Sequence, residues 1–481
     1  MNKRVIAGVA LAALLLDAGL AAARNPHCAG GIQYVIQAMK DKDRGNSEDY
    51  VREINKAVQQ LTECAAEDPA DLEAIGYLGW ALAEVDSAGP AGKAFQTAIT
   101  GMTAKGDKKV TNVSNNLDSY WAKAYNDGIN RLKAAQDTYP EYTKVPTDDE
   151  KPLKAEATKQ YETAIASLTR AKLLKPTSAL TIRNLGTAYA LMGRFDEAEI
   201  VMRNGLTEAA KDSAVAGLNE ALKTVRANKA GALLDAKKYD EAITYYQELI
   251  QLEPQNADHY MGMGSALFNR AQTKQDAARR ADFKLAGETY SKAFAIKPTN
   301  GDLGFNAALA FQSAGELALA EGAWRAVLKQ TPDDADALSS LGSTLADMQK
   351  FEEAVQVLTR AVNLKPDNKT YFRQLGAVYS KAGNNAKSTE MLMVYMAMNS
   401  GKVNADPAAA VKSAKAGSPA ANTATSMGSP DKVLDWDSEG RKLQTWIFTA
   451  KKQGFTFDAS GGMALVQKSD WSTAVTGGGK K

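Results

Sequence analysis

Few residues of this chain are of the types that perform covalent or metal chemistry. The 481 residues include two histidines, His27 and His259, and two cysteines, Cys28 and Cys64. Neither histidine has a partner at a spacing typical of a metal site or a nucleophile–base pair. The sequence also has no glycine-rich phosphate loop and no paired-cysteine metal motif. We therefore predict a protein that is not an enzyme, with no catalytic residue, no metal and no cofactor.

Two other groups of side chains have a structural and a chemical interpretation. Acidic pairs such as Asp333-Asp334 and Glu352-Glu353 stand at expected helix starts, where carboxylates stabilise the helix dipole. A methionine cluster lies on one expected helix and consists of Met391, Met393, Met396 and Met398. Packing, an exposed partner surface and copper(I) binding are the three interpretations of the cluster. We favour packing, because no histidine or cysteine accompanies the methionines.

The charge balance excludes two classes of partner. The chain has 58 basic and 56 acidic residues, for a formal net charge of +2. Nucleic acids and anionic membranes both require a concentrated basic surface. We therefore expect neither as the main partner.

The first 23 residues have the pattern of a secretory signal. Lys3 and Arg4 form a basic start, residues 5–16 are an apolar run, and residues 21–23 are small. The apolar run is too short to cross a bilayer, which makes a membrane anchor the weaker alternative. We expect an exported, soluble protein of the periplasm or cell envelope, with no transmembrane segment after the signal.

A fixed period of small and apolar residues organises most of the chain. Gly342 and Gly376 are 34 residues apart, and so are Pro332 and Pro366. Apolar side chains between these markers recur every three or four residues, which predicts two helices per period. A sustained period of this length indicates stacked helix pairs that contact mainly their neighbours.

These units resemble the tetratricopeptide repeat, in a protein of the exported bacterial type. In the unit at residues 335–366 the resemblance rests on Leu341, Gly342, Ala354 and Pro366. Six further units share the register and are marked by Gly79, Gly186, Tyr239, Gly264, Gly315 and Gly376. The resemblance implies an all-α fold, a right-handed superhelix of about nine repeats over residues 24–402.

Three inserts interrupt the regular period. They lie around residues 209–219 and 272–281, and the largest covers residues 137–152. Long loops are often functional or disordered. We favour plain surface loops and keep a partner contact as the alternative.

The resemblance also implies a protein-binding groove lined by the first helix of each repeat. The side chains that this places in the groove are Arg183, Asn184, Asn228, Asn306, Arg373 and Gln374. Asparagine is common here in the family, so hydrogen bonding between repeats is the alternative role.

The N-terminal unit resembles a degenerate repeat, with Cys28 in its first helix and Cys64 in its second. In an antiparallel hairpin the start of one helix lies beside the end of the other. In an oxidising compartment we therefore expect a Cys28–Cys64 disulfide rather than two free thiols.

The period ends near residue 402. Residues 403–430 are rich in alanine, serine, lysine and glycine, which predicts a flexible linker. Residues 431–472 contain three strand-like segments, at 443–448, 454–458 and 463–466, and predict a small β-meander. Its Trp436, Trp446 and Trp471 are expected to form a core rather than a ligand platform. Residues 473–481 are expected to be a disordered tail.

Taken together, these features predict a non-enzymatic exported scaffold that binds a protein or peptide partner in its groove. The alternative is a structural or assembly protein that self-associates through its repeat ends or its β module. An enzyme would need a site in the inserts or the C-terminal module, and these regions contain no histidine or cysteine.

Overall fold

The computed structural model describes residues 24–404, 406–460 and 462–473. The chain divides into two compact units, Met1–Lys229 and Ala230–Lys481, and each is described by itself. The expected signal at residues 1–23 lies outside the described residues, as does the expected tail beyond residue 473.

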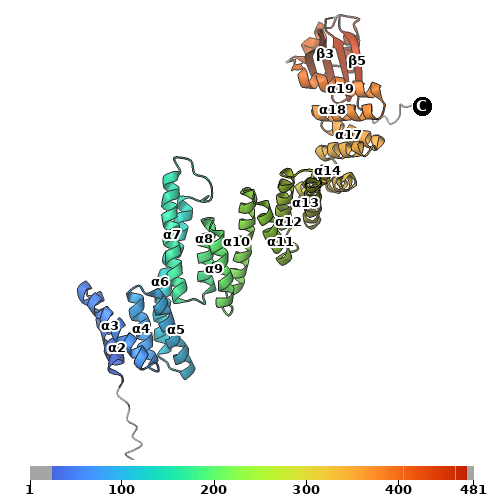
Figure 1. Cartoon of the computed structure of the whole chain (residues 1–481). Coiled ribbons are helices and arrows are strands. Elements are labelled where there is room, and N and C mark those ends of the chain that lie inside the picture. The colour runs from blue at the N-terminus through green and yellow to red at the C-terminus, as the bar shows by residue number, and fades with distance from the viewer. Residues whose placement is uncertain (1–23, 405, 461, 474–481) are drawn as a thin grey trace, which may run out of the picture. The chain divides into compact units, whose positions relative to one another are not determined.

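The first unit is built from helices that follow one another as antiparallel pairs (Figure 1). Its helices are α2 (Pro26–Asp43), α3 (Ser47–Glu67), α4 (Leu72–Glu84), α5 (Ala88–Lys105), α6 (Val110–Thr138), α7 (Lys151–Leu174), α8 (Ala179–Leu191) and α9 (Phe195–Glu208). Helix α10 (Val215–Asp235) contains the boundary between the two units.

The second unit continues the helix pairs and ends in a sheet. Its helices are α11 (Tyr239–Leu252), α12 (Ala257–Gln272), α13 (Asp276–Ile296), α14 (Gly301–Ala314), α15 (Leu317–Gln330), α16 (Ala335–Asp347), α17 (Phe351–Leu364), α18 (Lys369–Lys381) and α19 (Asn385–Ser400). Helix pairs of the repeat type followed by a small antiparallel sheet confirm the predicted fold class.

The periodic glycines are sites where the two helices of a pair approach closely. A Cβ atom on Gly342 of α16 would lie 2.5 Å from Leu358 Cγ of α17. A Cβ atom on Gly376 would lie 2.9 Å from Leu392 Cγ of α19. In both pairs the leucine follows its glycine by 16 positions. Interiors are close-packed, so a side chain at either glycine would push the helices apart.

The acidic residues at two helix starts favour the helix in different ways, Asp334 as a cap and Glu352 and Glu353 as charges in the first turn. The Asp334 carboxylate accepts hydrogen bonds of 3.0 Å from the backbone N–H groups of Asp336 and Ala337. Glu352 and Glu353 lie in the first turn of α17. The Asp334 contacts occupy N–H groups that a helix start leaves without partners.

The largest insert connects two long helices. Residues 139–150 join α6 to α7. The Tyr142 ring packs edge-on against Tyr161, with centroids 5.0 Å apart. The Tyr142 hydroxyl lies 2.8 Å from the Thr158 hydroxyl. Tyr142 therefore packs this insert on α7.

The C-terminal sheet is a five-stranded antiparallel meander in the order β1-β2-β3-β4-β5. Its strands are β1 (Lys402–Val403), β2 (Lys432–Ser438), β3 (Arg441–Phe448), β4 (Gln453–Asp458) and β5 (Ala464–Asp470). The three segments expected from the sequence correspond to β3, β4 and β5. Strands β1 and β2 are additional.

Residues 403–430 differ from the flexible linker that their composition predicts. They contain α20 (Pro407–Ser413) and α21 (Pro419–Met427). Asp406 and Ser418 cap these helices by accepting hydrogen bonds from the N–H groups of Ala409 and Ala421. Ala410 and Ala420 are buried in one cluster with Trp446 and other sheet residues. Alanine methyl groups thus pack on the aromatic rings of the sheet and form a core. The composition of residues 403–430 alone did not predict this core, because the aromatic rings come from the sheet.

Each face of the sheet is covered by helices. Trp436 and Trp471 join the core that contains Met391 and Val394 of α19. Trp446 belongs to the opposite cluster, with α20 and α21. All three tryptophans are buried. In the methionine cluster, Met391 is buried, Met393 and Met398 pack against the same core, and Met396 is 38% exposed.

None of the helices within residues 24–473 that the structure describes is long and apolar enough to cross a bilayer.

Candidate binding surfaces on the first helices

First helices of successive pairs lie next to one another from α2 to α8 in the first unit and from α16 to α18 in the second. In the first unit, α2 contacts α4, α4 contacts α6, and α6 contacts α8. In the second unit, α16 contacts α18. Each unit therefore has a surface made by neighbouring first helices, which we call its first-helix face.

The six residues predicted for the groove all lie on first helices, but they are divided between the units. The first unit contains Arg183 and Asn184 on α8 and Asn228 on α10. The second contains Asn306 on α14, and Arg373 and Gln374 on α18. The six residues thus contribute to two surfaces that are considered separately.

Two of the six side chains connect neighbouring repeats. The Asn184 amide donates a hydrogen bond of 2.7 Å to the Tyr125 hydroxyl of α6. The Gln374 amide accepts one of 2.6 Å from the Ser339 hydroxyl and donates one of 3.0 Å to that of Ser343, both on α16. These contacts match the alternative role, hydrogen bonding between repeats.

The other four side chains have no polar partner within the described residues, and we call them uncommitted. Arg183, Asn228, Asn306 and Arg373 make no side-chain hydrogen bond or ion pair with the part of the chain that the structure describes. Asn228 and Arg373 are exposed, and Arg183 and Asn306 are half-buried. Their donors and acceptors are available to a partner.

A polar cluster around Glu84 joins three successive helix pairs in the first unit. The Glu84 side chain, on α4, is only 6% exposed. Its carboxylate accepts hydrogen bonds of 2.5 Å from Lys42 Nζ of α2 and of 2.5 Å from the Tyr50 hydroxyl of α3. It also accepts a hydrogen bond from the Tyr120 hydroxyl of α6. A carboxylate with three donors is a satisfied buried charge.

The cluster fixes the charge state of its members. Burial acts to raise the pKa of the Glu84 carboxyl, but the donors Lys42, Tyr120 and Tyr50 outweigh it and lower that pKa. Burial and the hydrogen bond to Glu84 raise the pKa values of Tyr50 and Tyr120. Glu84 is therefore ionised, and both tyrosines are neutral donors, at neutral pH.

Beside this cluster lies a cleft between α4 and the start of α6. The Trp80 indole N–H donates a hydrogen bond of 3.0 Å to the Tyr120 hydroxyl, which links Trp80 to Glu84. The Tyr77 and Trp80 rings are stacked with centroids 5.8 Å apart. The cleft has a volume of about 450 Å³. Its lining residues are Glu73, Gly76, Tyr77, Trp80, Lys109, Asn112, Val113, Asn115 and Asn116. We call it the α4–α6 cleft.

Family models match two parts of the second unit. Residues 305–369 match a model described as tetratricopeptide repeat, and residues 232–269 match one described as TPR repeat. The chain contains tetratricopeptide repeats. The 232–269 match covers α11 and most of α12, and the 305–369 match covers most of α14 and all of α15, α16 and α17. Such repeats generally serve as scaffolds for protein–protein interaction.

Solved structures give further likenesses. A MamA fragment from Desulfovibrio magneticus RS-1 is 20% identical, with 37% of this chain and 94% of that chain covered at a TM-score of 0.31. A structure described as YrrB, a TPR protein with an unusual peptide-binding site, is 19% identical. The match to YrrB covers 41% of this chain and 91% of the YrrB chain, with a TM-score of 0.31. No curated protein matches the chain at a significant level.

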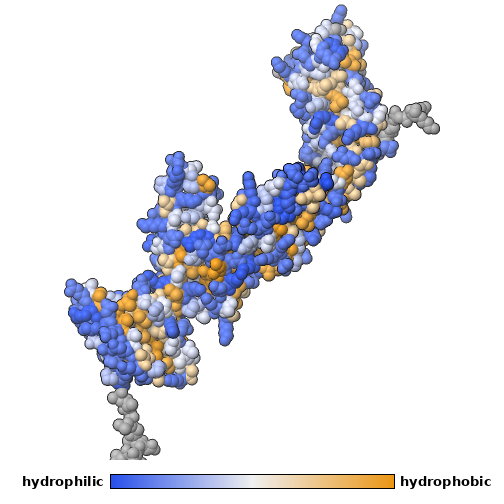
Figure 2. Space-filling model, in the orientation of Figure 1, coloured by the Kyte–Doolittle hydropathy of each residue, from blue (hydrophilic) through white to orange (hydrophobic). Residues whose placement is uncertain are grey.

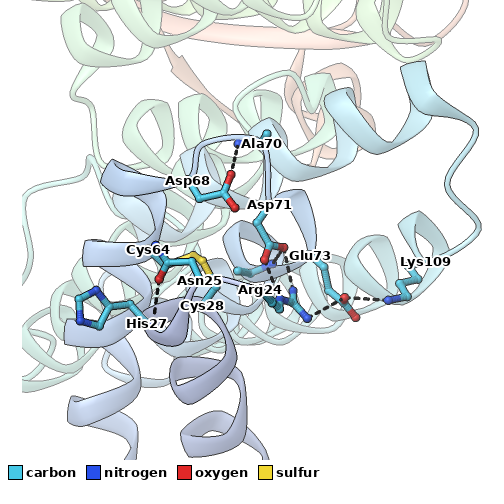
Figure 3. A network of polar contacts seen from close by, with 11 residues as sticks. Arg24, Asn25, His27, Cys28, Cys64, Asp68, Ala70, Asp71, Glu73 and Lys109 are labelled. Carbon is cyan, nitrogen blue, oxygen red and sulfur yellow. Dashed lines mark hydrogen bonds and ion pairs between the residues drawn. A yellow bond between two sulfur atoms is a disulfide. The ribbon is translucent and has the colours of Figure 1, made fainter. Parts of the chain in front are cut away.

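The N-terminal repeat is fastened by ionic and covalent links (Figure 3). Arg24 Nε and Nη2 contact the two carboxylate oxygens of Asp71 at 2.6 and 2.7 Å. Arg24 Nη1 lies 3.3 Å from Glu73, which pairs with Lys109 Nζ at 2.7 Å. These contacts connect the segment before α2 to the starts of α4 and α6. Burial acts to raise the pKa of Asp71, but the hydrogen bonds from Arg24 and the Ala74 N–H, together with the positive charges of Arg24 and Lys109, outweigh burial and lower that pKa.

The expected disulfide pairing is the one that the structure contains. Cys28 of α2 and Cys64 of α3 are both buried, with Cα atoms 4.9 Å apart and a bond between their sulfur atoms. Asp71 lies close to both sulfur atoms. Sulfur atoms held in a disulfide are not thiolate ligands, so this group is not a metal site.

Sequence reasoning did not identify the Glu84 cluster or the α4–α6 cleft. The available signal was aromatic density on expected first helices, with Tyr77 and Trp80 three residues apart and Tyr120 beside Trp121. Three residues of separation place two side chains on one helix face. The role of Glu84 had no signal, because its donors come from residues 34 to 42 positions away.

Proposed function

We propose that the protein is a non-enzymatic scaffold that binds a partner protein on the first-helix faces of its repeats. The observation that carries this proposal is the presence of tetratricopeptide repeats with uncommitted polar side chains on their first helices. Arg183, Asn228, Asn306 and Arg373 are the side chains that we assign to partner contact.

Hydrogen-bonding groups without an internal partner favour this role. An arginine at an interface contributes strongly when a partner desolvates it, and arginine is enriched among the residues that dominate binding energies. Asn184 and Gln374, in contrast, already bond to a neighbouring repeat. We assign them to the stability of the face rather than to partner binding.

Apolar surface on the first unit is a second support for this proposal. Figure 2 shows apolar residues gathered over α4 and α5 on the face towards the viewer. An interface typically combines an apolar centre with a polar rim.

We also propose that the chain is exported to the periplasm or cell envelope. Residues 1–23 have the pattern of a secretory signal, and the Cys28–Cys64 pairing requires an oxidising compartment to persist. Fractionation of cells that express the full chain tests this. We expect the protein in the periplasmic fraction, shortened at its N-terminus and without free thiols. A cytoplasmic chain of full length would contradict the proposal.

Affinity capture from a periplasmic extract tests the scaffold function. The probes are residues 24–481 and two double variants, Arg183→Ala with Asn228→Ala and Asn306→Ala with Arg373→Ala. We expect at least one double variant to bind a captured partner about tenfold more weakly, a loss of about 1.4 kcal/mol.

Lys93→Ala and Lys329→Ala are the matched controls. Both lysines are exposed on second helices, and neither side chain makes a hydrogen bond or ion pair within the described residues. Equal loss in the controls and in the double variants would contradict the proposal. Light scattering on the purified chain tests the alternative function, a self-associating structural protein. An average molar mass that rises with protein concentration, with no other protein present, would indicate self-assembly.

A further inference from the structure

The α4–α6 cleft has a chemistry that the scaffold function does not use. One of its walls is aromatic, since Tyr77 and Trp80 line it. Three asparagines from α6, Asn112, Asn115 and Asn116, also line it. Its volume of about 450 Å³ lies in the range of small-molecule sites, about 300–1,000 Å³.

The aromatic wall is held in place before any ligand arrives. Trp80 donates its indole N–H to Tyr120, which in turn donates to the buried Glu84. Glu84 is also held by Lys42 and Tyr50 from the preceding pair. The only polar atom of Trp80 is therefore occupied, and the rest of its ring offers apolar surface. A wall fixed in this way loses little side-chain freedom on binding.

The amide groups are free to bind. Asn112, Asn115 and Asn116 make no side-chain hydrogen bond within residues 24–404 or the later described segments. Asn112 and Asn115 are exposed, and Asn116 is half-buried. Each amide has two donors and one acceptor oxygen, so each can bond to a hydroxyl group in either direction.

The charges in the cleft are neutralised. Glu73 pairs with Lys109 at 2.7 Å and with Arg24 at 3.3 Å, and Arg24 also pairs with Asp71. No uncompensated charge is left among the lining residues to select an anion or a cation. The matching ligand is uncharged, with an apolar face for the rings and hydroxyl groups for the amides.

A sugar ring has both of these surfaces. Its C–H groups form an apolar face and its hydroxyls project from the edge. We propose that the α4–α6 cleft binds a neutral saccharide that packs on Tyr77 and Trp80 and bonds to Asn112, Asn115 and Asn116. This site is separate from the residues that we assign to the protein partner.

Saturation-transfer NMR on residues 24–481 tests the proposal. The probes are neutral tetrasaccharides of glucose, in α-1,4 and β-1,4 linkage, and of N-acetylglucosamine in β-1,4 linkage. We expect transfer to at least one of them, together with a change in tryptophan fluorescence. Asn112→Ala and Asn115→Ala should each weaken binding about tenfold, the loss expected for one hydrogen bond.

Further variants separate a binding role from a folding role. Trp80→Phe keeps an aromatic ring and should retain partial binding, whereas Trp80→Ala should abolish it. Asn126→Ala is the matched control, because Asn126 is exposed on the same helix, outside the cleft, and should leave binding unchanged. Asn115 is exposed, so its variant should keep the circular dichroism of the parent chain.

Three outcomes would overturn the proposal. The first is an absence of transfer to every tetrasaccharide. The second is binding that Asn112→Ala and Asn115→Ala leave unchanged. The third is binding of an extended peptide in the cleft, seen as a change in tryptophan fluorescence that the tetrasaccharides neither cause nor reverse. That result would assign the cleft to the protein partner instead.

Discussion

Single residues determine how closely neighbouring helices and repeats are held together. Glu84 accepts hydrogen bonds from side chains of α2, α3 and α6, and therefore joins three helix pairs through one carboxylate. Gly342 and Gly376 act differently, because they allow close approach within a pair. The glycines were recognisable from their period, and the role of Glu84 was not, because its partners are distant in the sequence.

Replacement of Glu84 by alanine should destabilise the first unit. The substitution leaves Tyr50 and Tyr120 without their acceptor, and Lys42 without its ion pair, in a largely buried place. We expect the free energy of unfolding to fall by about 2–3 kcal/mol, as for buried polar groups that lose a partner. Urea unfolding measures it. Glu141→Ala, which removes an exposed pair with Lys144, should change it by less than about 1 kcal/mol.

The contribution of Glu84 should depend on pH. Its pKa is lowered in the folded state, so the folded state favours the ionised carboxylate. The stabilisation is then fully present above the unfolded pKa of about 4.3 and is lost as pH falls through the lower folded pKa. The difference in unfolding free energy between the parent and Glu84→Gln should therefore shrink from about pH 7 to about pH 3. A difference that grows on acidification would contradict the account.

The disulfide should also contribute to the free energy of unfolding, and this contribution can be measured by replacing one pair of residues. It closes a separation of 36 residues between Cys28 and Cys64. The chain-entropy model assigns such a loop roughly 3–4 kcal/mol. We expect a Cys28→Ser, Cys64→Ser double variant to unfold at correspondingly lower urea concentration. Mass analysis under non-reducing conditions gives the control, since two free thiols in the parent would refute the pairing.

At the scale of elements, the sheet closes the C-terminal end of the helix pairs. Trp471 is buried and packs edge-on against Phe372 of α18, with centroids 5.0 Å apart. Ser469 donates a 2.8 Å hydrogen bond to the Glu390 carbonyl of α19. The last repeat thus has a folded partner where further repeats would otherwise be needed to cover its apolar side.

Two tryptophan variants should separate the faces of the sheet. Trp471→Ala creates a cavity at the junction with α18 and α19, and Trp446→Ala does so on the side of α20 and α21. Such truncations cost about 3–5 kcal/mol. Hydrogen exchange should accelerate most in α19 for the first variant and most in α20 and α21 for the second. An identical pattern in both would argue against two separate cores.

At the scale of the whole chain, the regular repeats were predictable and the irregular parts were only partly so. The 34-residue spacing of Gly342 and Gly376 identified the helix pairs, because each glycine faces a leucine 16 residues later. Helices α20 and α21 were missed, because alanine-rich segments acquire a core only from the aromatic residues of the sheet. Among the groove candidates, no sequence feature separated Asn184, which bonds to Tyr125, from Asn228, which has no such contact.

The central claim is that partners bind the first-helix faces, and site-specific photocrosslinking in the periplasm tests it most directly. A photoreactive residue is placed at Asn228, Asn306 or Arg373 on first helices, and at Lys93 or Lys329 on second helices. We predict crosslinks to another protein from one or more first-helix positions and none from the two second-helix positions. Crosslinks from Lys93 or Lys329 with none from the first helices would contradict the account.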